Sequence, residues 1–347
     1  MGSAMRKIIW FLVAIISIYW ITGTTDVNEI YQAKIPTEYQ YLLWLAFFSS
    51  FAVKLPMWPV HTWLPDAHVE APTPGSVILA AVLLKMGTYG FLRFLLPLFP
   101  VAAQHPVIVM TMLILGLIGI IYTALVAAVQ PDAKKLVAYT SVAHMGFVVL
   151  GVFALTVNGL QGGLIVMISH GLSTGALFLL LGMLYERRHT RTIADFGGIA
   201  RVAPWFATAF VITALASIGV PGTSGFIGEF LTLLGTFETH PVIAVLATFG
   251  VIFAAYYMLP MVQTIFFNKL EIPENQDVKD LTRREITILA PLCALMIWIG
   301  WNPTPFLDRM ELSVRAVIER VESVKPASQA LGEVGEKTNE HQAEEAD

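Results

Sequence analysis

The sequence has few charged residues and only one cysteine. Charged side chains make up 13% of its 347 residues, whereas hydrophobic residues make up 56% and the mean hydropathy is +0.69. Soluble domains carry about 25% charged residues, so the composition indicates an integral helical membrane protein. Cys293 lies inside an apolar run, which excludes intrachain disulfides and cysteine metal clusters and favours a role as core filler.

Motifs of soluble catalysis and of nucleic-acid binding are also missing. The chain has no Gly-rich phosphate loop and no nucleophile elbow. No small-residue cleavage site follows its first apolar run, so that run does not read as a removable signal peptide. The net charge of −4 is concentrated near the C-terminus, and this charge distribution does not indicate nucleic-acid binding.

The apolar runs predict an all-α integral membrane protein with about nine transmembrane helices, since each span needs about 20 mostly apolar residues. Two of these helices are expected to be discontinuous. Pro56 and Pro59 break the second run just after Lys54, and residues 218–225, IGVPGTSG, divide the seventh, which is too long for one span. The nine runs cover residues 8–21, 41–63, 76–96, 107–129, 136–157, 160–184, 204–237, 241–267 and 285–300.

Lysines and arginines in the predicted loops set the orientation. Twelve lie on the side of the N-terminus, whereas only Lys34 lies in a loop on the other side. The positive-inside rule therefore predicts a cytoplasmic N-terminus and a periplasmic C-terminus. The twelve are Arg6, Lys7, Lys134, Lys135, Arg187, Arg188, Arg191, Arg201, Lys269, Lys279, Arg283 and Arg284.

The C-terminal part differs from the rest of the chain. Residues 1–301 would form the transmembrane unit. Residues 302–325 would form an amphipathic helix on a membrane surface or a partner, because apolar residues recur at helical spacing opposite charged ones. Residues 326–347 are polar and rich in glutamate, which predicts a disordered acidic tail.

Five ionisable residues lie well inside the predicted spans, on five different helices: Lys54, Lys85, His144, His170 and Glu229. A lysine at mid-membrane depth costs roughly 2.5–3.5 kcal/mol on insertion scales, so such residues usually serve a function. Histidine titrates near neutrality and can pass a proton between its ring nitrogens. Together the five predict a lateral proton relay, although each histidine alone fits an interhelical hydrogen bond equally well.

A second group, around Pro65, resembles a metal set at first sight. His61, Asp66, His68 and Glu70 lie at a span end without a helical i, i+4 pair of histidines. We expect capping groups or the mouth of a water-filled channel there, and no bound metal.

Long segments of the chain resemble a known family, the antiporter-like membrane subunits of proton-pumping NADH:quinone oxidoreductase (respiratory complex I). The similar segments are FAVKLPMWPVHTWLPDAHVEAPTPGSVILAAVLLKMGTYGFLR at 51–93, KKLVAYTSVAHMGFVVLG at 134–151, SHGLSTGALFLLLG at 169–182 and GVPGTSGFIGEF at 219–230. Within this family the chain is most similar to the M-type subunits, called subunit 4 in mitochondria. Glu229 favours that assignment, because L- and N-type subunits typically carry lysine there.

The resemblance implies a role for each matching residue. Lys54 would be the switch lysine of the first broken helix, and Lys85 the central relay lysine. His144 and His170 would be relay or water-organising positions, and Glu229 the terminal carboxylate. More weakly, His61 matches a histidine of the first broken helix.

One departure from the family pattern concerns Lys54. The resemblance implies that the first five transmembrane helices are missing, so the chain would be a fragment, a shortened gene model or part of a split gene. The missing part would hold the glutamate that pairs with Lys54. Asp26, Glu29 and Glu38 do not replace it, since all three lie in the predicted outer loop.

The resemblance implies a proton-translocating subunit in a bacterial plasma membrane, less so a mitochondrial one. NADH, FMN, iron–sulfur clusters and quinone would bind in partner subunits, with no cofactor in this chain. Partners would be L- and N-type subunits, the lipid bilayer and a separate polypeptide carrying the missing helices, with no nucleic acid. The alternatives are a subunit of a multisubunit cation/proton antiporter or of a membrane-bound hydrogenase.

Overall fold

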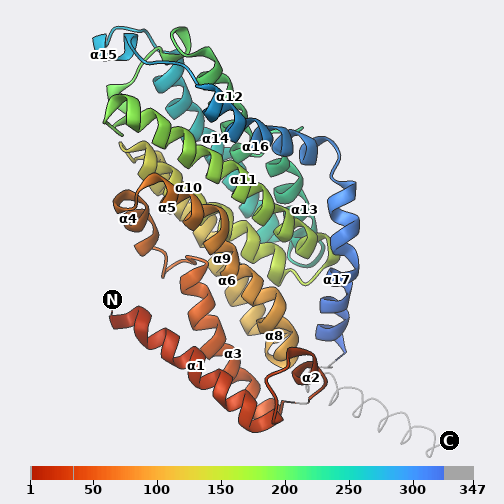
Figure 1. The fold of residues 1–347 in the computed structure, drawn as a ribbon. Helices are drawn as coiled ribbons and strands as arrows, with labels where there is room; N and C mark the ends of the chain where they lie inside the picture. Colours follow the sequence, from red (N-terminus) through yellow and green to blue (C-terminus); the bar gives the residue numbers. More distant parts are fainter. Residues whose placement is uncertain (1, 34, 324–347) are drawn as a thin grey trace, which may run out of the picture.

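The computed structural model describes residues 2–33 and 35–323. Within these residues the regular structure is helical, with a single isolated β-bridge between Asp132 and Thr192. Figure 1 shows an elongated bundle in which α9, α10 and α11 run through the middle, while α1 and α3 lie at one end. The predicted all-α class is confirmed.

The helices follow one another in an order that matches the predicted runs. They are α1 (Gly2–Thr22), α2 (Val27–Gln32), α3 (Thr37–Lys54), α4 (Trp63–Glu70), α5 (Thr73–Ile78), α6 (Leu84–Gly90), α7 (Leu96–Leu98), α8 (Pro100–Ala103), α9 (Pro106–Ala128), α10 (Ala133–Phe153), α11 (Val157–Arg188), α12 (Pro204–Ile218), α13 (Ser224–Thr239), α14 (Pro241–Val262), α15 (Pro273–Gln276), α16 (Arg283–Trp301) and α17 (Thr304–Glu322).

Several of these helices are long and apolar enough to cross a membrane. In the described part of the chain six qualify, and two shorter apolar helices, Ile9–Thr22 and Pro204–Ile218, accompany them. This supports an integral membrane protein, whereas the exact number of nine spans stays a prediction. The six are Thr73–Leu98, Pro106–Ala128, Ala133–Phe153, Val157–Arg188, Pro241–Phe267 and Arg283–Trp301.

Both predicted helix breaks are present. At the first break, α3 ends at Lys54, and helical structure resumes only at Trp63. The second break lies between α12 and α13, where Gly219 has a φ of +80° and ends α12. Glycine adopts this left-handed conformation without the steric penalty that a Cβ would bring. The break sequences therefore predicted the local structure correctly.

The span at 76–96 was expected to be one regular helix, and the structure differs there. Two π-helical turns, Leu79–Leu83 and Phe91–Leu95, flank α6. Such turns contain i→i+5 hydrogen bonds and occur frequently at functional sites. Lys85 lies directly after the first of them.

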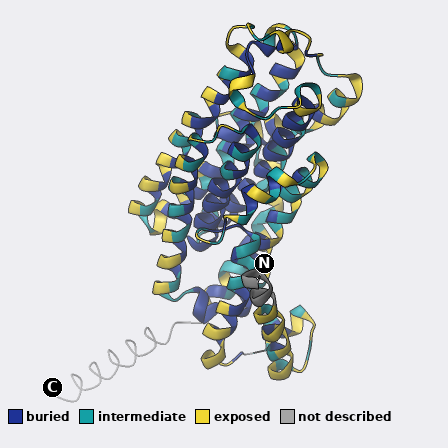
Figure 2. Cartoon of the chain, turned by 90° about the vertical axis from the view of Figure 1, so that its left-hand side faces the viewer, coloured by how far each residue is buried: buried dark blue, intermediate teal, exposed yellow. Residues whose placement is uncertain are grey.

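The core of the bundle is centred on α10. This helix is buried along almost its whole length and packs against α9, α11 and α13. Figure 2 shows the buried residues in the middle of the bundle and exposed ones along its flanks. The exposed flanks are themselves apolar, and Trp20 and Trp301 are 82% and 86% exposed. Such an outward-facing apolar surface suits a hydrocarbon environment.

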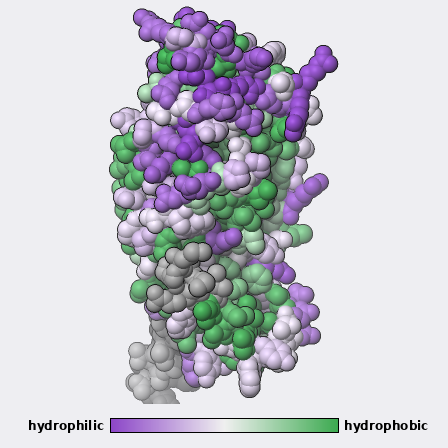
Figure 3. Space-filling model, turned by 60° about the vertical axis from the view of Figure 1, so that its left-hand side comes forward, coloured by the Kyte–Doolittle hydropathy of each residue, from purple (hydrophilic) through white to green (hydrophobic). Residues whose placement is uncertain are grey.

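Polar side chains gather at one end of the molecule. On the face seen in Figure 3, hydrophilic residues cover the end that carries α15 in Figure 1, and the hydrophobic patches lie below it among less hydrophobic residues. That end includes the basic loops that follow α11 and α14.

At the opposite end of the bundle, α17 packs against α7, α8 and α11. Val314 and Val321 are buried in this contact. The predicted C-terminal helix is thus present and packs on the chain's own bundle, whereas the bounds 302–325 stay a prediction. The predicted acidic tail, 326–347, lies outside the described residues.

Candidate functional site

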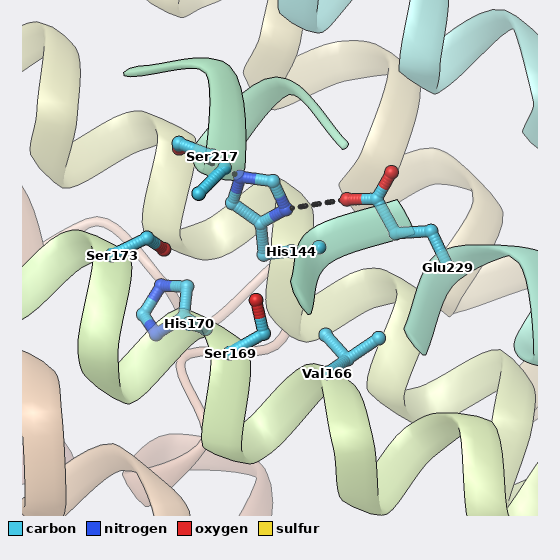
Figure 4. A pocket seen from close by; sticks show the side chains of 9 residues that line it. His144, Val166, Ser169, His170, Ser173, Ser217 and Glu229 are labelled. Atoms are coloured by element: carbon cyan, nitrogen blue, oxygen red, sulfur yellow. Dashed lines mark hydrogen bonds and ion pairs between the residues drawn. The ribbon is translucent and has the colours of Figure 1, made fainter. Parts of the chain in front are cut away.

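A small cavity lies where α10, α11, α12 and α13 meet. Its volume is about 10 Å³, close to the smallest volume that holds one water molecule. Figure 4 shows His144, His170 and Glu229 around it. The complete lining consists of His144, Val166, Ser169, His170, Ser173, Ala216, Ser217, Gly225 and Glu229.

On one side of the cavity, His144 of α10 and Glu229 of α13 form a buried pair. The Nδ1 atom of His144 lies 3.0 Å from Oε1 of Glu229. The two residues are only 6% and 4% exposed. A carboxylate in such a place is costly unless an ionic or hydrogen-bonded partner compensates for lost water, and His144 is that partner.

The break between α12 and α13 makes room for this carboxylate. A Cβ atom on Gly219 would approach Oε2 of Glu229 to 2.6 Å, too close for a real contact. The unwound segment therefore serves the site directly, by letting the backbone lie against the carboxylate.

On the other side of the cavity, Lys85 of α6 contacts His170 of α11. The Lys85 Nζ atom lies 2.6 Å from Nδ1 of His170 and donates a second hydrogen bond of 2.6 Å to the Ala80 carbonyl. Ala80 belongs to the π-helical turn before α6, so the irregular backbone helps to hold the ammonium group. Gly171 lets α11 pack closely against this π-helical turn, since a Cβ there would lie 3.1 Å from the Ala81 carbonyl.

The two pairs are separated by one short gap. The imidazole rings of His144 and His170 are 5.6 Å apart between centroids. Nε2 of His170 is buried and has no hydrogen-bond partner among the described residues. The order of groups is thus Lys85, His170, cavity, His144 and Glu229.

Four of the predicted relay residues are therefore brought together, and Lys54 is not. Lys54 is half-buried at the end of α3, and it has no hydrogen bond or ion pair with any residue in 2–33 or 35–323. Its neighbour Leu55 packs against Gly87 of α6, two residues beyond Lys85. Lys54 thus belongs to an adjoining element without contacting the Lys85–Glu229 group.

His61 also lies apart from the four residues. It is buried, its ring lies 6.0 Å from that of Tyr122, and its Nδ1 has no partner in the described part of the chain. His68 stacks on Phe178 with ring centroids 4.4 Å apart. Among the described residues no group of three or more His, Cys, Asp or Glu side chains could hold a metal ion.

Sequence reasoning missed the serines of the site. Ser217 Oγ lies 3.4 Å from His144 Nε2, and Ser169 Oγ lies 2.7 Å from Ser224 Oγ. Ser217 directly precedes the IGVPGTSG segment, Ser224 lies within it, and Ser169 precedes His170. Small hydroxyl residues beside a helix break or an intramembrane histidine were the available signal.

The sequence matches a known family and several named proteins. Residues 8–254 match the family model described as NADH:quinone oxidoreductase/Mrp antiporter, TM. NADH-quinone oxidoreductase subunit M of Rhodobacter capsulatus is 48% identical over 321 residues, covering 89% of this chain and 62% of that protein. NADH-ubiquinone oxidoreductase chain 4 of Chondrus crispus is 46% identical, covering 89% of this chain and 63% of that protein. The chain thus spans slightly less than two thirds of these relatives.

Solved structures agree with the sequence matches. A chain of respiratory complex I from Thermus thermophilus superimposes with a TM-score of 0.85 at 34% identity, covering 92% of this chain and 67% of that one. A chain of the Mrp complex from a Dietzia species has a TM-score of 0.77 at 20% identity, covering 93% of this chain and 67% of that one. The second match shows the shared fold alone.

Proposed function

The chain belongs to the NADH:quinone oxidoreductase/Mrp antiporter transmembrane family, and from this premise we propose that it is a proton-translocating membrane subunit of M type. The observation that carries the proposal is the buried series Lys85, His170, His144 and Glu229, contributed by four helices. Ionisable groups inside a membrane protein are costly and are typical of proton pathways.

The first transfer in this proposal joins Lys85 and His170. A protonated Lys85 donates to Nδ1 of His170 at 2.6 Å, a distance at which a proton can pass along the hydrogen bond. Imidazole that gains a proton at Nδ1 can release one from Nε2. Because Nε2 of His170 is buried without a partner among the described residues, it is the natural exit.

The second transfer joins the cavity to Glu229. A water molecule in the cavity would take the proton from His170 to Nε2 of His144, beside Ser217. His144 then releases a proton from Nδ1 to Glu229, 3.0 Å away. Each step exchanges a charged and a neutral form between neighbours, so the charge on one group biases the protonation of the next.

In this proposal the oxidation of NADH and the reduction of quinone occur in partner subunits. The relatives of this chain are subunits of NADH-quinone oxidoreductase, and the solved structures it matches are multisubunit complexes, so other membrane subunits are its partners. We infer L- and N-type subunits as those partners, with the N-terminus in the cytoplasm of a bacterium. Lys54 would respond to the field of a neighbouring group and modulate the affinity of Lys85 for a proton.

A cation/proton antiporter subunit is the second candidate, because the family and the Dietzia fold match include Mrp proteins. The 34% identity to complex I against 20% to the Mrp chain favours the first. Transport coupled to a Na⁺ gradient without NADH would favour the second.

The test is proton pumping by the assembled complex in proteoliposomes. We expect Lys85→Ala and Glu229→Ala to remove most of the proton translocation per electron, and Lys85→Arg and Glu229→Asp to be milder because the charge survives. Lys269→Ala is the matched control, since its side chain is 83% exposed. Wild-type proton-to-electron ratios in both alanine variants would overturn the proposal.

A further inference from the structure

A second, larger cavity lies beneath α17, at the end of the bundle opposite α15 (Figure 1). Its volume is about 550 Å³, within the range of small-molecule binding sites. Its walls come from α2, the end of the Thr73–Leu98 span, the start of α11 and one face of α17. The lining residues are Tyr31, Tyr89, Leu92, Arg93, Pro97, Leu160, Leu164, Ser313, Val314, Ala316, Val317 and Arg320.

Two arginines from distant parts of the chain converge in this cavity. The guanidinium carbon of Arg93 lies 5.4 Å from the centre of the Tyr31 ring. Arg320 donates through Nη2 to the Tyr31 carbonyl, and the Tyr31 hydroxyl donates to the Arg93 carbonyl. Tyr31 therefore contacts both arginines, and both line the same cavity.

The described part of the chain supplies no counter-charge for them. Neither arginine forms an ion pair with a carboxylate in residues 2–33 or 35–323. Nε of Arg320 is buried and lacks an acceptor there. Burial raises the pKa of Tyr31, although both arginines act in the other direction, so the phenol stays neutral. Two guanidiniums without an anion favour an anionic ligand.

Most of the remaining wall is apolar. Leu92 and Leu160 are buried, and Leu164 and Val317 are half-buried beside Val314. An anion such as free phosphate would leave this surface unused, whereas an acyl chain would cover it.

We propose that this cavity binds an anionic phospholipid, with the phosphodiester on Arg93 and Arg320 and an acyl chain along Leu92, Leu164 and Val317. Arginine suits this role because its planar guanidinium presents paired donors to phosphate oxygens. The bound lipid would join α17 to the Thr73–Leu98 span and α11. The inference is independent of the proposed proton relay, since none of these residues belongs to it.

The experiment is native mass spectrometry of the full chain in detergent, titrated with dioleoylphosphatidylglycerol or dioleoylphosphatidylcholine. We expect about tenfold tighter binding of phosphatidylglycerol, since each basic residue near an anionic headgroup contributes several-fold. Arg93→Gln combined with Arg320→Gln should remove this preference. Arg315→Gln is the control, because Arg315 lies on α17, is exposed and pairs with Glu311 outside the cavity.

A second variant separates lipid from free anion and leaves both arginines in place. Leu164→Trp fills the apolar part of the cavity, and we expect it to weaken phosphatidylglycerol binding at least fivefold. The site would be an anion site only, and the proposal wrong, if inorganic phosphate competed fully in the millimolar range and Leu164→Trp had no effect. Equal binding of the two lipids, or a preference kept in the arginine double variant, would also overturn it. Binding seen only after removal of the acidic residues 324–347 would point to that segment as the occupant instead.

Discussion

Glu229 and His144 form a buried pair, with 3.0 Å between Oε1 and Nδ1, that joins the second half of a broken helix to the most buried helix of the bundle. The pair depends on the break itself, because Gly219 lies against the carboxylate. The relay that we propose therefore depends on backbone geometry as well as on its ionisable side chains.

The two left-handed glycines of this break allow a matched comparison. Gly219→Ala should displace the Glu229 carboxylate, because its Cβ would meet Oε2 at 2.6 Å. Gly222→Ala carries a similar backbone cost of about 1 kcal/mol but meets nothing within 4 Å. We expect both to lower Tm slightly and only Gly219→Ala to lower proton pumping, at least fivefold. Equal pumping in the two variants would contradict the close approach.

The histidines allow a second comparison. His144→Phe keeps a ring of similar shape but removes the nitrogens that face Glu229 and Ser217, so pumping should fall by most of its value. His61→Phe should have a much smaller effect, since His61 contacts Tyr122 and lies outside the series. Proton-to-electron ratios in proteoliposomes measure both. A larger loss for His61→Phe would place the pathway along the first broken helix instead.

Lys54 requires a different expectation. It has no partner among the described residues, so its charge would act on the relay through the electric field. Lys54→Ala should therefore lower pumping strongly, and Lys54→Arg should retain most of it. If Lys54→Arg were as impaired as Lys54→Ala, the lysine would act by direct proton transfer and the field account would be wrong.

A stability prediction concerns the loops at the α15 end. Arg187 donates to both carboxylate oxygens of Glu285, at 2.9 and 2.8 Å, and both side chains are largely buried. Arg187→Met should lower the free energy of unfolding by about 2 kcal/mol, since it leaves Glu285 without its charged donor. Lys269→Met, which breaks an exposed pair, should change it by less than about 0.5 kcal/mol. Thermal unfolding in one detergent compares the two.

Much of the architecture could be predicted from local sequence. Proline after Lys54 and the IGVPGTSG segment have direct conformational consequences, so both helix breaks were expected where they occur. The π-helical turns around α6 could not be predicted, because residues 79–83 and 91–95 are apolar stretches that fit a regular helix equally well. The packing of α17 depends on long-range contacts that helical periodicity does not specify.

For the site, residue type indicated which residues belong to it, but the sequence did not indicate which of them are neighbours. The cost of burying ionisable groups singled out Lys85, His144, His170 and Glu229, and the structure brings these four together. Their order along the series depends on which helices pack against each other, which the sequence does not reveal. For the same reason the separation of Lys54 from Lys85 could not be foreseen.

The most direct test of the relay is the proton-to-electron ratio of three complexes in proteoliposomes: His170→Phe, Glu229→Gln and the double variant, each with quinone reduction checked. If the groups act in series, removing a second one adds nothing. The account predicts that the double variant keeps the same proton-to-electron ratio as the single variant with the lower ratio. Losses that multiply in the double variant would show two independent pathways and contradict a single relay through the His144–Glu229 pair.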